Sequence, residues 1–196
     1  GMTAAYDKDG QLIAEANPFT DERSTCYFNQ ENLTLAPETE MEPTDENLLL
    51  PAFRYGTSEF LKAIGASKVV IGVSGGIDSA VNAALYRSIL PAENILLVNT
   101  PTRYNSELTK GLAAELAKNL GCQLLTVPIG DFIDETADAL EGLPLPDDTV
   151  HLTGFMEDNM QARDRSSRIL AALSAAFGGI FTCNANKTET TVGYGT

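Results

Sequence analysis

The chain has 196 residues, 43% of them apolar and 20% charged, which suits a folded protein with a sizeable core rather than a disordered one. The net charge is −14, from 13 basic and 27 acidic residues. Repulsion from phosphate groups therefore argues against a nucleic-acid or anionic-membrane partner. The longest apolar runs, such as Val69–Val73, are too short to cross a bilayer. With no signal peptide at its start, we expect a cytoplasmic protein.

The cysteine and histidine content argues against a structural metal site. Cys26, Cys122 and Cys183 are far apart, none lies in a CxxC pair, and His151 is the one histidine. This set lacks the ligands of a structural zinc site. We interpret the three cysteines as reduced thiols.

Residues 3–35 have the pattern of β structure joined by turns. Asp9-Gly10 lies between short extended runs, which is typical of a hairpin. Residues 24–28 are a further strand candidate. Two or three strands cannot bury a face alone, so we expect this segment to pack on another part of the protein or on a partner.

A linker and a helix are expected next. Residues 36–45 contain two prolines and dense acidic charge, which predicts a linker. Thr44 or Asp45 can cap a following helix that runs to about Ile64. Pro51 lies inside that pattern, so we expect a break or kink there.

From Lys68 onward, apolar strands alternate with helices. Residues 69–73 are β-branched without polar alternation, as in a strand covered on both faces. The further elements expected are helix 78–90, strand 94–99, helix 106–120, strand 123–129, helix 131–140, helix 155–177 and strand 180–183, then a polar turn. This order predicts an α/β fold, a parallel sheet with helices on both faces. Such sheets bind ligands at the C-terminal ends of their strands.

The segment Ser74-Gly75-Gly76-Ile77-Asp78-Ser79 joins the first of these strands to its helix. Its glycines allow a tight turn and close approach to a ligand, and the helix N-terminus offers free N–H groups to an anion. The Gly-Lys-Ser/Thr ending of a Walker A loop is absent. Because Asp78 would repel phosphates without a cation between them, we expect Mg²⁺ to bridge the two.

This string resembles the pyrophosphate-binding loop of the N-type ATP pyrophosphatases, which cleave ATP between the α- and β-phosphates and adenylate an acceptor. The resemblance implies an ATP- or pyrophosphate-binding role for Ser74, Gly75, Gly76, Ile77, Asp78 and Ser79, with Asp78 as a metal ligand. The alternative is a glycine-rich turn that binds no ligand.

Two further segments resemble the glutamine-dependent NAD synthetases of that superfamily. Residues 100–106, Thr-Pro-Thr-Arg-Tyr-Asn-Ser, resemble the family's Met-Pro-Ser-Arg-Tyr-Ser and imply that Arg103 contacts ATP. Residues 157–165 resemble Glu-Asn-Leu/Ile-Gln-Ala-Arg-x-Arg-Gly and imply that Arg163 binds deamido-NAD. The alternatives are a plain connecting loop and a solvated helix face with pairs such as Asp164–Arg168.

A last segment, residues 186–196, resembles the family's Asn-Lys-Ser-Glu-x-x-Val-Gly-Tyr-x-Thr. The resemblance implies that Glu189 binds Mg²⁺ with ATP and that Lys187 binds deamido-NAD; the alternative is a surface turn. Asn184 and Ala185 stand where small Thr and Ser residues are usual in the family. We expect Asn184 among the ATP-binding residues, with an altered contact to the α-phosphate.

The resemblance covers about residues 48–196, and residues 6–28 resemble the last strands of a nitrilase-like glutaminase domain. We therefore expect residues 1–35 to end a glutaminase domain, 36–45 to be a linker, and 46–196 to be a NAD synthetase domain truncated at its C-terminus. The family's catalytic groups would lie beyond Thr196, so little or no turnover is expected from this chain alone. Apolar surface at the cut side of the sheet predicts a homo-oligomer, a dimer.

The reaction that the resemblance implies is the ATP-dependent amidation of deamido-NAD to NAD, catalysed by a carbon–nitrogen ligase. The nicotinate carboxylate attacks the α-phosphate, pyrophosphate leaves, and ammonia, free or derived from glutamine, displaces AMP from the adenylate. Two alternatives stay open. One is a non-catalytic nucleotide-binding fragment, and the other is a different N-type ATP pyrophosphatase such as a GMP synthetase.

Overall fold

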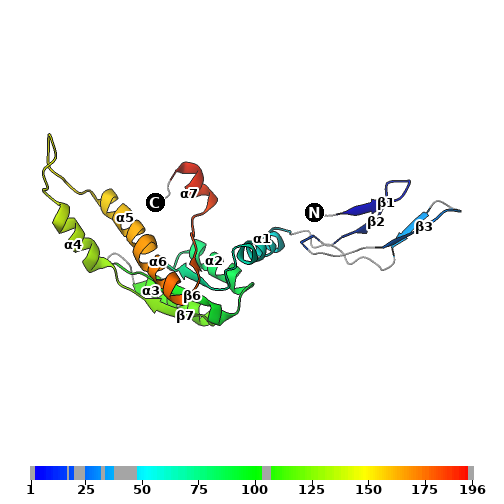
Figure 1. Ribbon diagram of the computed structural model, residues 1–196, viewed down its shortest axis with the longest axis horizontal. Helices are drawn as coiled ribbons and strands as arrows, with labels where there is room; N and C mark the ends of the chain where they lie inside the picture. The colour runs from blue at the N-terminus through cyan, green and yellow to red at the C-terminus, as the bar shows by residue number, and fades with distance from the viewer. Residues whose placement is uncertain are drawn as a thin grey trace. The chain divides into compact units, whose positions relative to one another are not determined.

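The computed structural model describes residues 3–16, 18–19, 25–31, 34–37, 48–102 and 107–193 (Figure 1). The chain divides into two compact units, Gly1–Gly56 and Thr57–Thr196. Over the described ranges, no helix combines the length and the apolar character that crossing a bilayer requires.

Two antiparallel hairpins form the β structure of unit Gly1–Gly56. They consist of β1 (Ala4–Tyr6) with β2 (Leu12–Glu15), and β3 (Cys26–Asn29) with β4 (Thr34–Pro37). The hairpin around Asp9-Gly10 and a strand close to residues 24–28 are therefore confirmed. Strand β4 extends into the first residues of the predicted linker, most of which lies outside the described residues.

The turn of the first hairpin is held by one carboxylate. Asp7 Oδ1 accepts hydrogen bonds from the backbone N–H groups of Asp9 at 2.9 Å and Gln11 at 2.8 Å. Gly10 has φ +80°, a left-handed conformation that glycine adopts without strain. The Asp side chain thus stabilises the turn between β1 and β2 in the manner typical of short polar residues.

Helix α1 (Leu49–Ala63) contains Pro51 without interruption, so the predicted break there is wrong. The helix begins just before Pro51, which places the proline in the first turn. The first N–H groups of a helix have no intrahelical partner, so a proline there removes no hydrogen bond. Further along α1, Leu61 is buried in the core of unit Thr57–Thr196.

Four parallel strands form the sheet of unit Thr57–Thr196, in the order β7-β6-β5-β8. Their bounds are β5 (Val69–Gly72), β6 (Ile95–Asn99), β7 (Gln123–Thr126) and β8 (Ile180–Phe181). The two central strands are buried along their length apart from Gly72. This burial on both faces explains why their sequences lack polar alternation.

The helices and short helical segments of this unit follow in chain order. They are α2 (Ile77–Arg87), η1 (Ala92–Asn94), α3 (Glu107–Leu120), α4 (Gly130–Leu140), α5 (Gly154–Arg163), the π-helical segment η2 (Asp164–Leu170), α6 (Ala171–Phe177) and α7 (Lys187–Val192). Figure 1 shows helices on both sides of the sheet, which confirms the predicted α/β class.

Alternate residues of β5 divide the core into two layers. Ile71 packs with Ala83 of α2 and Ala113 of α3 on one face of the sheet. Val70 packs with Leu170 of η2 on the other face. The small residues on α2 and α3 allow these helices to lie close to the sheet, because short side chains reduce the distance between backbones.

Two elements differ from the sequence-based expectation. The helix expected over residues 155–177 is present, but η2 interrupts its α-helical geometry between α5 and α6. The polar turn expected after the last strand is instead the short helix α7.

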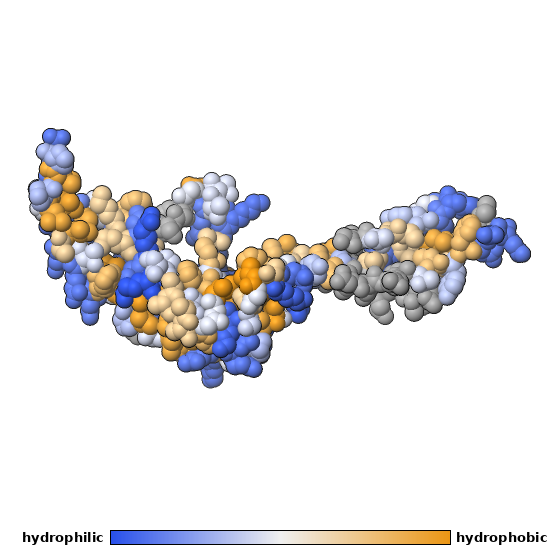
Figure 2. Space-filling model, in the orientation of Figure 1, coloured by the Kyte–Doolittle hydropathy of each residue, from blue (hydrophilic) through white to orange (hydrophobic). Residues whose placement is uncertain are grey.

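Large apolar side chains remain exposed on several helices of this unit. Figure 2 shows apolar residues interspersed with polar ones on the face displayed. The most exposed are Ile77 and Val81 on α2, Phe155 on α5 and Val192 on α7, with exposed fractions from 60% to 73%.

Candidate functional site

The loop after β5 turns through a glycine and leads into an uncapped helix. Gly75 has φ +85°, a conformation that a residue with a Cβ rarely adopts. Gly76 is the N-cap residue of α2 and supplies no side-chain cap. Gly76 therefore caps none of the first backbone N–H groups of α2. Uncapped N–H groups at a helix start can bind an anionic ligand.

Two serines close the loop on itself. Ser74 Oγ accepts from the Gly76 N–H at 3.2 Å. Ser79 Oγ donates to the Gly76 carbonyl at 2.9 Å and accepts from the Ser74 N–H at 3.4 Å. Ser74 is exposed, whereas Ser79 is buried, so Ser79 holds the loop and Ser74 faces solvent.

Asp78 and Glu189 both contact Asn186. Asn186 Nδ2 donates to Asp78 Oδ1 at 3.4 Å, and the Asn186 backbone N–H donates to Glu189 Oε2 at 2.9 Å. The Asn186 side chain accepts from the Glu189 N–H at 2.9 Å, which completes a capping box at the start of α7. The two carboxylates expected to bind Mg²⁺ thus share Asn186 as a hydrogen-bonding neighbour.

This pair of carboxylates is not by itself a metal cluster. Within the described part of the chain, no group of three or more His, Cys, Asp and Glu side chains is placed to hold a metal ion. Mg²⁺ commonly binds through one or two carboxylates together with substrate phosphates and water. The arrangement of Asp78 and Glu189 is suited to that mode.

Asn184 lies between β5 and α2 and makes hydrogen bonds within the protein. Its Nδ2 donates to the Gly72 carbonyl oxygen at 2.6 Å, and its Oδ1 accepts from Asn82 Nδ2 at 2.6 Å. The other N–H of the amide makes no hydrogen bond to a residue that the structure describes, so it can bind a ligand. The residue expected at the α-phosphate is therefore largely engaged in holding the end of β5.

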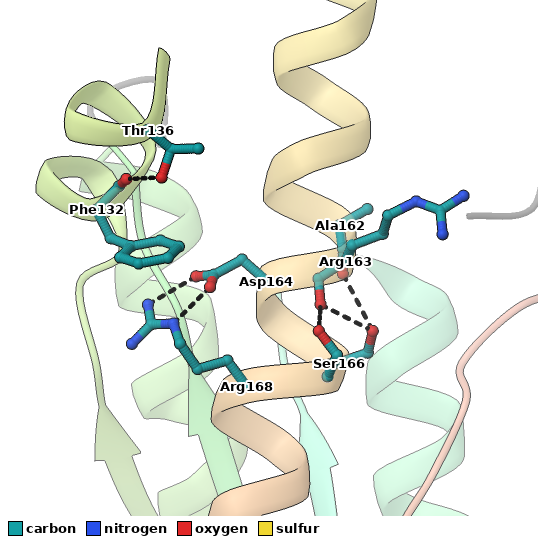
Figure 3. A network of polar contacts seen from close by, with 8 residues as sticks. Phe132, Thr136, Ala162, Arg163, Asp164, Ser166 and Arg168 are labelled. Carbon is teal, nitrogen blue, oxygen red and sulfur yellow. Dashed lines mark hydrogen bonds and ion pairs between the residues drawn. The ribbon is translucent and has the colours of Figure 1, made fainter. Parts of the chain in front are cut away.

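The two cations predicted to bind deamido-NAD are both exposed. Arg163 is the last residue of α5 and Lys187 is the first residue of α7, and both are exposed. Figure 3 shows the Arg163 side chain directed away from Asp164 and Arg168. Neither cation has a hydrogen bond or ion pair to any residue that the structure describes, which leaves both charges available to an anion.

The Asp164–Arg168 pair is formed, with one partner buried. Arg168 Nε and Nη2 donate to the two Asp164 carboxylate oxygens at 2.5 and 2.8 Å, and the Asp164 side chain is 5% exposed. The guanidinium also lies 4.3 Å from the ring centre of Phe132 on α4 (Figure 3). The hydrogen bonds to Asp164 raise the pKa of Arg168, so the guanidinium stays charged. It ties η2 to α4, next to Arg163.

The remaining predicted contact lies in a segment that the structure leaves out in part. Thr100, Pro101 and Thr102 follow β6, but Arg103 lies outside the described residues. The predicted contact between Arg103 and ATP therefore stays a prediction.

A match to a protein family shows which family the chain belongs to. The sequence model of the NAD synthase family matches residues 54–196. The chain belongs to the NAD synthase family. This match favours the NAD synthetase interpretation over a GMP synthetase.

Full-length relatives extend beyond the chain. It is 34% identical over 202 residues to a glutamine-dependent NAD(+) synthetase from Xylella fastidiosa strain Temecula1, and the alignment covers 100% of this chain and 36% of that protein. The chain therefore spans little more than a third of this NAD synthetase relative.

Solved NAD synthetases have the same fold. The glutamine-dependent NAD+ synthetase from Acinetobacter baumannii, solved with adenosine diphosphate, has a TM-score of 0.85 and 27% identity, over 96% of this chain and 35% of that chain. The NH3-dependent NAD synthetase from Campylobacter jejuni, solved with nitrate, has a TM-score of 0.67 and 27% identity, over 78% of this chain and 62% of that chain.

Sequence reasoning missed the contacts that Asn82 and Asn186 make in this candidate site. The capping role of Asn186 had a usable signal, since Asn followed three positions later by Glu is a helix-start pattern. Asn82 had none, because an asparagine inside a helix predicts no particular partner. Its contact with Asn184 spans 102 residues of chain and depends on the tertiary fold.

Proposed function

We propose that this chain carries the ATP-binding part of a NAD synthetase, a carbon–nitrogen ligase. The reaction proposed for the whole protein is the amidation of deamido-NAD to NAD through an adenylated intermediate, with release of AMP and pyrophosphate. Membership of the NAD synthase family and similarity to the glutamine-dependent NAD(+) synthetase of Xylella fastidiosa support this proposal.

One observation carries the proposal at the level of the site. Asn186, the N-cap residue of α7, contacts both Asp78 beside the anion-binding loop and Glu189. Asp78 belongs to the loop at the C-terminal end of β5, where parallel sheets bind their ligands, and Asn186 links it to Glu189. A loop built for an anion and flanked by two carboxylates is suited to a nucleotide bound with a divalent cation.

The residues fit magnesium in its usual role beside phosphates. Mg²⁺ prefers oxygen ligands, and Asp78 and Glu189 would supply two of them, with the ATP phosphates and water as the rest. When bound, the ion would neutralise negative charge on the phosphates. Ser74 and the backbone N–H groups near Gly76 at the start of α2 would bind the pyrophosphate oxygens.

The two exposed cations are proposed to bind the second substrate, deamido-NAD. Arg163 and Lys187 would bind the phosphates or the carboxylate of deamido-NAD, because both charges lack a described protein partner. A guanidinium can bind either group through two parallel hydrogen bonds. Arg103 is proposed to contact ATP, and no residue of this chain is assigned a role in transferring ammonia.

The N-terminal unit and the assembly state complete the proposal. Residues 1–35 are proposed to end a glutaminase domain that supplies ammonia, 36–45 to be a linker, and 46–196 to belong to the synthetase domain. Exposed apolar side chains such as Ile77 and Val81 support association into a homodimer. The free cysteines Cys26, Cys122 and Cys183 support the proposal of a cytoplasmic location.

Ligand-dependent thermal unfolding tests this proposal without requiring turnover. A ligand at about 100 times its Kd stabilises the folded state by about 2.7 kcal/mol, a shift of several degrees in Tm. We expect stabilisation by ATP with Mg²⁺ and by deamido-NAD, and none by xanthosine monophosphate. No shift with ATP would contradict the proposal, and a shift with xanthosine monophosphate alone would indicate a different ATP pyrophosphatase.

An activity assay separates the enzyme from a non-catalytic nucleotide-binding protein. Formation of NAD from deamido-NAD, ATP and ammonia is measured for the protein that contains these residues. Formation of NAD together with AMP supports a synthetase. ATP binding without any NAD from the full-length protein would favour the non-catalytic alternative.

A further inference from the structure

A set of polar side chains ties α2 to the chain that leaves β8. Asn82 Nδ2 donates to Asn184 Oδ1 at 2.6 Å and to Thr182 Oγ1 at 3.0 Å. Asn184 Nδ2 donates in turn to the Gly72 carbonyl oxygen at 2.6 Å. We name the three side chains of Asn82, Thr182 and Asn184 the amide bridge.

The amide bridge replaces a backbone rung of the parallel ladder between β5 and β8. The preceding rungs are backbone hydrogen bonds of 3.1 Å each, from Ile180 N–H to Lys68 O and from Thr182 N–H to Val70 O. The same register would next join the Asn184 N–H to Gly72, but the Asn184 side chain donates that bond instead. The backbone of Asn184 can thus leave the sheet toward α7 while the end of β5 stays bonded.

The hydrogen bonds define one orientation of the Asn184 amide. Gly72 O can only accept, so the amide nitrogen must face it. Asn184 Oδ1 then faces Asn82, whose Nδ2 donates to it. Without Asn82, the remaining described donor to Asn184 Oδ1 is the Thr182 hydroxyl at 3.3 Å, a longer and weaker contact.

The amide bridge adjoins the proposed ATP site along two segments of the chain, the end of β5 and helix α2. Gly72 ends β5 just before Ser74 of the loop. On α2, Asn82 lies one helical turn after Asp78, on the same helix face. The partners of these two residues, Asn184 and Asn186, follow each other closely before α7. The bridge therefore connects the loop, α2 and the segment leading to Glu189.

We propose that Asn82 and Asn184 are positioning residues that set the spacing between the Ser74–Ser79 loop and the segment carrying Glu189. The inference rests on the proposed ATP site. Asn82 acts through Asn184 and Thr182, and Asn184 acts through the Gly72 carbonyl. The bridge thereby fixes where the phosphates and the cation can be held together, since such ligands tolerate little displacement of their partners.

Amide NMR spectra of the ligand-free chain test the bridge independently of ATP binding. The Asn82→Ala variant is expected to shift the amide signals of residues 72–76 and 184–189 and to speed their hydrogen exchange. Asn119→Ala, at an exposed position of α3, is the matched control and should leave those signals unchanged. Changes confined to residues next to Asn82 would overturn the proposal, because the loop would then not depend on the bridge.

Nucleotide affinity gives the second readout. Asn82→Ala and Asn184→Ala are each expected to raise the Kd for ATP with Mg²⁺ about tenfold, and the double variant no further, because both act through one bridge. Asn82→Leu, which keeps the volume and lacks the amide, should match Asn82→Ala. Variants that fold with a lower Tm and an unchanged Kd would overturn the positioning role.

The two proposals fail in different ways. If the unmodified chain binds no ATP with Mg²⁺, the proposed nucleotide site is refuted, and the NMR comparison still decides whether the bridge positions the loop. If the unmodified chain binds ATP and the variants bind it equally well, the nucleotide site stands and the bridge is refuted.

Discussion

Asn186 Nδ2 lies 3.4 Å from Asp78 Oδ1, and this contact joins the first turn of α2 to the N-cap of α7 across 108 residues of chain. The Asn186 backbone N–H is bonded at the same time to Glu189. Asn186 thus contacts one carboxylate through its side chain and the other through its backbone, beside an anion-binding loop. A divalent cation could neutralise both charges at this place, which is the basis of the predictions on nucleotide binding.

Replacing Asp78 with asparagine should change the metal dependence of ATP binding. The amide keeps the shape of Asp78 and can still accept from Asn186, so the main change is the lost charge. We expect the Kd for ATP with Mg²⁺ to rise about tenfold or more, because a metal ligand is lost. In EDTA the affinity for ATP should stay the same or increase, since a negative charge near the phosphates is gone. Isothermal titration calorimetry measures both values.

Asp131→Asn is the matched control for this experiment. Asp131 is an exposed acidic residue in the first turn of α4, as Asp78 is in the first turn of α2. Both changes alter the net charge and a helix-terminus interaction equally. Equal effects of the two substitutions on ATP affinity would contradict a metal-binding role for Asp78.

The Asp164–Arg168 pair should contribute to stability through the buried partner. Arg168→Met leaves the buried Asp164 carboxylate without its described partner, so we expect a loss of about 2 kcal/mol in the free energy of unfolding. The double variant Asp164→Leu with Arg168→Met should recover much of that loss, because no charge is left buried. Chemical denaturation measures these values.

Arg163→Met is the control for the ion pair. The Arg163 side chain is exposed and has no partner among the described residues, so its substitution should change stability by about 0.5 kcal/mol or less. A single Arg168→Met variant as stable as Arg163→Met would show that the ion pair and the Phe132 contact contribute nothing measurable.

Gly179 should tolerate no side chain. A Cβ there would lie 2.3 Å from the Lys68 carbonyl oxygen and 2.6 Å from its carbon, and backbone atoms cannot move aside cheaply. We expect Gly179→Ala to destabilise the fold by about 3 kcal/mol. Gly111→Ala, on α3 where a Cβ meets nothing within 4 Å, should instead stabilise by up to about 1 kcal/mol. Thermal unfolding measures both changes in Tm. A change of the same sign in both variants would contradict this prediction.

Asn186→Ala should loosen α7 without unfolding the sheet. The substitution removes the capping box, an effect of about 1 kcal/mol, and α7 contains no buried residue among those described. Hydrogen exchange of the α7 amides should therefore speed up about fivefold, as 1 kcal/mol implies. Thr153→Ala, which removes the cap of α5, should leave α7 unchanged. Unchanged exchange in the Asn186 variant would contradict the capping role.

The central part of the fold was predictable because its strands are buried on both faces. Val69–Val73 and residues 94–99 are apolar without alternation, and only a strand with two covered faces needs that pattern. The loop from Ser74 to Ser79 followed from glycines placed between a strand and a helix. Local sequence decides such features, so no tertiary information was required.

The contacts between distant segments were not predictable in the same way. The π-helical segment after Arg163 shows no distinct sequence pattern, and the Pro51 position was misjudged because the start of α1 was placed too early. Asn184 matched a ligand position of the family, yet its amide is directed to Gly72 and Asn82. Pairings of this kind depend on which elements the fold brings together.

The most direct test of this account is calorimetric titration of ATP into the unmodified chain and the Glu189→Gln variant, each with Mg²⁺ and with EDTA. Glutamine can still serve in the capping box, so the variant isolates the charge of Glu189, and Glu115→Gln on α3 is the control. We expect ATP binding that requires Mg²⁺ and weakens about tenfold in Glu189→Gln but not in Glu115→Gln. ATP binding that is equal with Mg²⁺ and with EDTA, or equal in the two variants, would contradict the proposal that Asp78 and Glu189 hold the cation.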